Sequence, residues 1–108
     1  MSGAANEAMA NPGRGEAALE IGGEALRLRP TFAALVAAEQ ELGPLFEIIE
    51  RAAEGKLSLG DLAALFWHCL VDRERVTRET LGEAIVAAGL ARATPALKAI
   101  VRQILAGT

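Results

Sequence analysis

The chain has 108 residues, with 11 Lys or Arg against 14 Asp or Glu, and a net charge of −3. A chain of this length supports one domain with a modest core. The acidic balance, with no cluster of Lys and Arg, argues against binding nucleic acid through its phosphates. The longest unbroken apolar run is seven residues, whereas a helix that spans a bilayer needs about 20. We therefore expect a soluble, intracellular protein with no membrane partner.

Residues 1–13 are small and polar and show no hydrophobic periodicity. Such a segment cannot bury enough apolar surface to offset the entropy of ordering it. We expect a mobile N-terminal tail over residues 1–13 and a single helical domain over residues 14–108.

The stretch from Glu16 to Arg29 alternates apolar and polar residues on both sides of Gly22 and Gly23. Two glycines between alternating runs predict a two-residue hairpin turn, because glycine adopts positive φ without a steric penalty. The turn fixes three facing pairs on the apolar side: Ile21 with Glu24, Leu19 with Leu26, and Ala17 with Leu28. We expect this apolar face to lie on helices or to meet another chain, and both outer edges of the hairpin to remain unpaired.

Helical periodicity and capping residues follow from Thr31 onward. Ser, Thr or Pro at a helix start and Gly at its end are typical boundary signals. The predicted helices span residues 32–42, 44–54, 59–71, 78–88 and 95 onward, with N-caps at Thr31, Ser58, Thr77 and Thr94. The fold class is therefore mainly α, with an N-terminal two-stranded antiparallel hairpin packed on a bundle of four to five short helices.

Several side chains on these helices have predicted environments. Phe32 and Phe46 lie among the apolar positions of the first two helices, and we expect both to be buried. His68 falls nearly opposite the apolar centre of the third helix, which indicates a surface position, whereas Cys69 falls in the core.

Glu39 projects into an apolar face, where a carboxylate needs a partner. We expect it to pair with Arg27 or Arg51 at the rim, or alternatively to contact a partner protein.

Candidate catalytic and metal sites are weak. His68 and Cys69 are adjacent, so on a helix they point about 100° apart and cannot form a nucleophile–base pair. One cysteine and one histidine cannot supply a Cys/His metal set. Gly22-Gly23 lacks the remaining residues of a phosphate-binding loop. We expect no catalytic residues, no cofactor and no metal.

Apolar surfaces are better candidates for function. The last helix carries an apolar stripe, which most simply closes the core but could also act as a helix-in-groove element. Trp67, on the flank of its helix, is expected to be half-buried in its own domain, with contact to a partner as the alternative. The candidate partner-binding residues are Leu19, Ile21, Leu26, Leu28, Trp67, Leu97, Ile100, Val101 and Ile104.

Four segments together resemble one known family. They are Asn11-Pro-Gly-Arg-Gly-Glu16, the hairpin around Gly22-Gly23, the helix from Phe32 to Gly43, and Gly55-Lys-Leu-Ser-Leu-Gly-Asp61. The chain is similar to small proteins of gene transfer agents and related siphophage-like tail clusters, described both as tail assembly chaperones and as tail tube-associated proteins. The resemblance covers roughly Asn11 to Leu90 and leaves the last helix unmatched.

This resemblance implies a non-enzymatic chaperone that coats the tape measure protein, or binds tail tube subunits, in the bacterial cytoplasm during particle assembly. The alternative is a structural subunit of the tail tube or its terminator, located in the particle's tail. A homo-oligomer is compatible with both. Tube subunits usually build rings from extensive sheet, so the small number of strand residues in this chain favours the chaperone.

Overall fold

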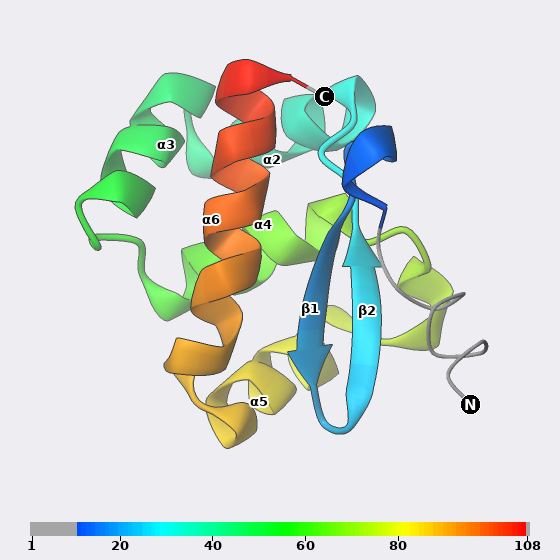
Figure 1. Ribbon diagram of the computed structural model, residues 1–108. Helices are drawn as coiled ribbons and strands as arrows, with labels where there is room; N and C mark the ends of the chain where they lie inside the picture. The colour runs from blue at the N-terminus through cyan, green and yellow to red at the C-terminus, as the bar shows by residue number, and fades with distance from the viewer. Residues whose placement is uncertain (1–10, 108) are drawn as a thin grey trace.

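The computed structural model describes residues 11–107, apart from the side chain of Pro12. The elements, shown in Figure 1, are η1 (Pro12–Arg14), β1 (Ala17–Ile21), β2 (Glu24–Leu28), α2 (Phe32–Leu42), α3 (Leu45–Ala53), α4 (Leu59–Cys69), η2 (Arg73–Arg75), α5 (Arg78–Ala88) and α6 (Leu90–Ala106). The predicted fold class, mainly α with an N-terminal hairpin, is confirmed. Most of the predicted mobile tail, residues 1–10, lies outside the described part of the chain.

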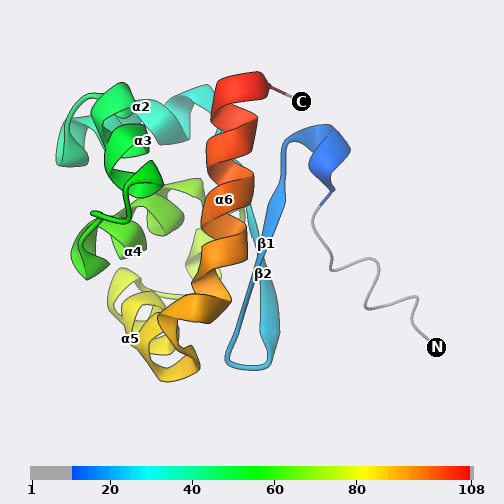
Figure 2. The same ribbon diagram turned by 60° about the vertical axis from the view of Figure 1, so that its left-hand side comes forward.

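The hairpin forms in the predicted register. Leu19 pairs with Leu26, and Ile21 faces Glu24 across the turn. Gly22 and Gly23 have φ values of 58° and 77°, which are the positive angles that a tight two-residue turn needs. Figure 2 shows the hairpin edge-on, with α2 to α6 all on one side of it. Its apolar face is therefore a wall of the core.

The outer edge of β2 is paired, contrary to the prediction that both edges are open. Leu28 forms a bridge with Leu70 just after α4. The Arg29 N–H donates to the Cys69 carbonyl at 2.7 Å, and the Val71 N–H donates to the Arg27 carbonyl at 3.0 Å. Helix α4 accordingly ends at Cys69, two residues earlier than predicted, because the following residues extend to pair with β2.

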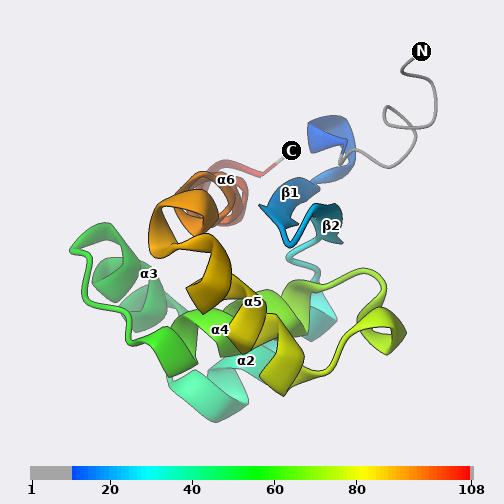
Figure 3. The same cartoon turned by 90° about the horizontal axis from the view of Figure 1, so that it is seen from below.

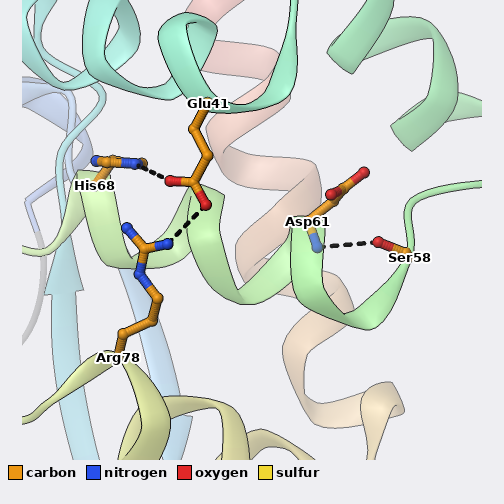
Figure 4. Close-up of polar contacts among 5 residues, drawn as sticks. All are labelled: Glu41, Ser58, Asp61, His68 and Arg78. Carbon is orange, nitrogen blue, oxygen red and sulfur yellow. Dashed lines mark hydrogen bonds and ion pairs between the residues drawn. The ribbon is translucent and has the colours of Figure 1, made fainter.

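Three of the predicted N-caps are confirmed. The hydroxyl groups of Thr31, Ser58 and Thr77 each accept the backbone N–H three residues later, at 3.0 to 3.1 Å. Figure 4 shows the cap formed between Ser58 and the Asp61 N–H. These caps satisfy N–H groups that have no partner within the helix.

The start of α6 was predicted wrongly. The helix begins at Leu90 and continues through Pro95, and Thr94 is not its cap, because the Thr94 hydroxyl donates to the Leu90 carbonyl. Gly89, with φ of 97°, ends α5 and lets α6 start at once, with an angle of 117° between the two helices. Among the described residues no single helix is long and apolar enough to cross a bilayer; only this bent pair meets the criteria of length and composition.

Helix α6 runs alongside β1, and α4 and α5 complete the core beneath the hairpin (Figures 1 and 3). The largest fully buried side chains come from the hairpin and from the helices: Phe66, Leu19, Leu28, Ile48, Leu65, Leu81, Ile85 and Ile100.

Phe32 and Phe46 are instead exposed, at 85% and 76%, so their predicted burial was wrong. Phe46 projects about 100° away from the buried face of α3, which is centred on Ile48 and Ile49. A prediction made from the apolar character of Phe46 alone therefore assigned it to the core wrongly.

Candidate interaction surface

The predicted partner-binding residues fall into two groups. Those of the hairpin, together with Ile100, are buried in the chain's own core, because α6 packs against β1. Trp67, Leu97, Val101 and Ile104 are half-buried. In this conformation only the second group can contact another molecule, and partner binding by either group stays a prediction.

A groove lies between α3 and α6, which stand side by side in Figures 1 and 2. Its volume is about 290 Å³, and its floor is formed by Ala52 and Ala53 of α3 with Leu97 and Val101 of α6. Thr94, Lys98 and Arg102 line the α6 side. We call this feature the α3–α6 groove.

Helical spacing explains why apolar side chains gather there. Leu97, Val101 and Leu105 are four residues apart and form a strip beside the buried face of α6. Leu105 is 60% exposed. On α3, Phe46 and Ala53 are seven residues apart, so they share one face. The apolar surface therefore continues past the groove on both helices.

The charge on the α6 side of the groove is entirely positive. Helix α6 carries Arg92, Lys98 and Arg102 and no acidic residue, although the chain as a whole is acidic. Among the described residues, neither Lys98 nor Arg102 has a carboxylate oxygen within 4.0 Å. The groove thus combines an apolar floor with two cations that have no ion-pair partner within residues 11–107.

A polar cluster on the other side of the helix bundle joins α2, α4 and α5 (Figure 4). His68 Nε2 lies 2.8 Å from one carboxylate oxygen of Glu41, and the Arg78 guanidinium donates to the other at 2.6 Å. Hydrogen bonds from His68, then from Arg78, lower the pKa of the Glu41 carboxyl below its usual value of 4.5. The cluster connects three helices that are separate in sequence.

His68 was predicted to be a surface residue, and that prediction was wrong. Its side chain is only 12% exposed. Helix α2, which supplies Glu41, lies over this side of α4, and the periodicity of α4 by itself does not reveal a second helix there.

Cys69 is buried as predicted, and burial raises the pKa of its thiol to about 12. A thiol with so high a pKa is protonated at neutral pH and is a poor nucleophile.

Glu39 pairs with neither predicted arginine. Its carboxylate accepts the backbone N–H of Leu45 at 2.8 Å, which satisfies a free donor at the start of α3. Arg27 instead bonds to Asp72, and Arg51 to Asp61. Glu39 is exposed, so the prediction that it projects into an apolar face was wrong. Its partner is a free N–H group of the following helix, which was not among the predicted partners.

A second hollow has a more polar lining. This hollow, of about 580 Å³, lies between the hairpin turn and the start of α6, and Glu20, Glu24 and Arg92 are among the residues that line it. It lacks the apolar floor that distinguishes the α3–α6 groove. Within residues 11–107, no group of three or more His, Cys, Asp or Glu side chains could hold a metal ion.

A family model described as phage tail tube protein, GTA-gp10 matches residues 14–107. The match includes the hairpin and every helix from α2 to α6, so it extends beyond the region ending near Leu90 that carried the sequence resemblance. Comparison with curated proteins and with solved structures gave no match.

Proposed function

The chain belongs to the phage tail tube protein, GTA-gp10 family, and from this membership we propose that it acts, without enzymatic activity, in building a phage-like tail. The observation that carries the proposal is the match over residues 14–107, nearly the whole described fold. The protonated, buried Cys69 thiol is consistent with a role that needs no nucleophile.

Within tail assembly, we propose that the chain is a chaperone that covers the tape measure protein, tail tube subunits or both, in the bacterial cytoplasm. Within residues 11–107 the sheet has two strands of five residues each, and the apolar face of that sheet is covered by the chain's own helices. Long chains with exposed apolar helical faces aggregate unless they are covered. The α3–α6 groove, together with exposed Phe46 and Leu105, supplies an apolar surface for such contacts.

The second candidate is a structural subunit of the tail tube or of its terminator. The family's description, which names the tail tube, supports it. A subunit stays in the finished particle, whereas a chaperone leaves before the particle is complete.

Quantitative mass spectrometry of purified particles separates the two candidates. A chaperone is expected in lysates of producing cells but at far below tube stoichiometry in mature tails. The major tube and tape measure proteins of the same particles serve as internal standards. If this chain occurs in mature tails at tube stoichiometry, the chaperone proposal is wrong and the structural one stands.

A co-expression pull-down tests the tail assignment itself. The tagged chain is expected to capture the tape measure protein or the tube protein encoded in the same cluster. Capture of neither, when both are soluble and expressed, would contradict both candidates.

A further inference from the structure

We propose that the α3–α6 groove docks one amphipathic α-helix of a partner chain, with an acidic flank of that helix facing α6. The inference rests on the proposed function only in taking the partner to be another protein. It specifies the docking surface and the chemistry of the occupant.

The shape of the floor suits a helix. Ala52 and Ala53 have small side chains, so the backbone of an occupant can approach α3 closely, while Leu97 and Val101 provide apolar contact on the other side. The strip from Leu97 to Leu105 spans eight residues of α6, which corresponds to about 12 Å, or roughly two turns of an occupant helix. Apolar residues at positions i, i+4 and i+7 of the occupant would lie along this strip.

The charges determine which flank of the occupant is acidic. Lys98 and Arg102 line the groove and have no acidic partner among the described residues. On α3, Glu50 lies on the face that carries Phe46 and Ala53, and none of the described ion pairs includes it. An acidic flank is therefore attracted to α6 and repelled by α3. Complementary charge of this kind selects both the partner and its orientation.

A synthetic peptide provides the direct test. The probe is a fluorescein-labelled amphipathic peptide of about four turns, with a Leu stripe, Glu along one flank and Gln along the other. The matched peptide has Lys in place of Glu. Fluorescence anisotropy with the full chain is expected to show binding of the Glu peptide about tenfold tighter than of the Lys peptide. Added salt is expected to narrow this difference.

Two variants locate the site. Ala53→Trp fills the groove from an exposed position, and we expect it to weaken binding of the Glu peptide by about tenfold or more. Ala91→Trp, also at an exposed position of the chain, is the matched control and should bind as the wild type does.

The double variant Lys98→Glu/Arg102→Glu tests the charges, and it should reverse the preference in favour of the Lys peptide. Arg29→Glu/Arg73→Glu changes the net charge equally at exposed positions away from the groove, and should not reverse it.

Several results would overturn the proposal. These are equal binding of both peptides, undiminished binding to Ala53→Trp, and no binding of the Glu peptide to the wild type. Sedimentation that shows a dimer of the wild type, lost in Ala53→Trp, would assign the groove to a second copy of the chain and would also overturn it. Circular dichroism confirms that each variant is folded.

The same variants separate this inference from the proposed function. If the wild type and Ala53→Trp capture a tail protein equally well, the groove assignment fails and the tail function stands. If the wild type binds the Glu peptide through the groove but captures no tail protein, the groove assignment stands and the tail function fails.

Discussion

Glu41 illustrates how a single carboxylate can connect three helices. His68 on α4 and Arg78 on α5 both bond to it and lower its pKa in the folded chain. A carboxyl group whose pKa is lower in the folded state stabilises the fold above its unfolded pKa, and this contribution is lost as the pH falls through the folded pKa. The stabilisation is therefore expected at neutral pH and should disappear in acid.

We predict that Glu41→Gln destabilises the chain at pH 7 and that the difference from the wild type shrinks below about pH 4. The Glu41 side chain is 37% exposed, so solvent screening keeps the loss to roughly 1 kcal/mol or less. Urea denaturation at pH 7 and pH 3 measures it. Glu83→Gln, which removes an exposed carboxylate from the middle of α5 that has no ion pair among the described residues, is the control. A loss that is equal at both pH values would contradict the role assigned to the cluster.

Cys69 provides a second test at the scale of the residue. Its thiol is buried and its pKa is raised to about 12, so a thiol reagent can react only after the core opens. We predict that labelling by an aromatic disulfide reagent in native buffer is slower than in denaturant by several orders of magnitude. Rapid labelling of the native chain, at a rate independent of added urea, would show that the thiol is accessible.

Residue environments were predictable where one helix determines them. The burial of Cys69 followed from the periodicity of α4. The positions of His68 and Glu39 did not, because Glu41 of α2 and the Leu45 N–H of α3 contact them from other helices. Tertiary partners of polar groups cannot be identified from the spacing within one element.

Among the elements, the hairpin was predicted most completely, because its register depends on a local turn. The turn requires positive φ, which Gly22 and Gly23 adopt, and the alternation of apolar and polar residues then assigns each strand residue to a face. The start of α6 was mispredicted because Thr94-Pro95 is a strong local start signal, whereas Gly89 had already ended α5 and allowed the next helix to begin.

We predict opposite outcomes for two substitutions in the turn. Gly22→Asn should leave stability nearly unchanged, since Asn tolerates positive φ at this position of the turn. Gly22→Val should destabilise the chain by about 1 kcal/mol or more, because a β-branched residue is strained there. Apart from Gly22 itself and its two chain neighbours, no residue has a heavy atom within 4 Å of an added Cβ at this position, so the effect isolates backbone strain. Thermal unfolding measures it, and equal melting temperatures for the two variants would contradict the assigned turn.

For the molecule as a whole, the contact between α6 and β1 joins the two ends of the described chain. Gln103 Nε2 donates to the Glu16 carbonyl at 2.8 Å, and Ile100 is fully buried near the hairpin. The sequence predicted both apolar surfaces separately. It did not predict that they pack against each other, or that α3 adjoins the outer flank of α6 to form the groove, because neither contact leaves a local signal.

We predict that α6 and the hairpin unfold as one cooperative unit. Removing α6 would uncover the face of β1 that carries Leu19, and a buried leucine contributes roughly 1.5–3 kcal/mol. Native-state hydrogen exchange should therefore give the same opening free energy for the buried amides of α6 and of β1. A much lower value for α6 would show that this helix undocks alone and exposes its inner stripe.

The packing of α6 on the hairpin also has a consequence for synthesis on the ribosome. Leu19 is made about 80 residues before Ile100, and at about 5–20 residues per second the interval is roughly 4 to 16 s. Throughout this interval the apolar face of the nascent hairpin lacks the helix that finally covers it. The native core therefore closes only after α6 has been made, and the speed of elongation between the hairpin and α6 determines how long that face stays open to other chains.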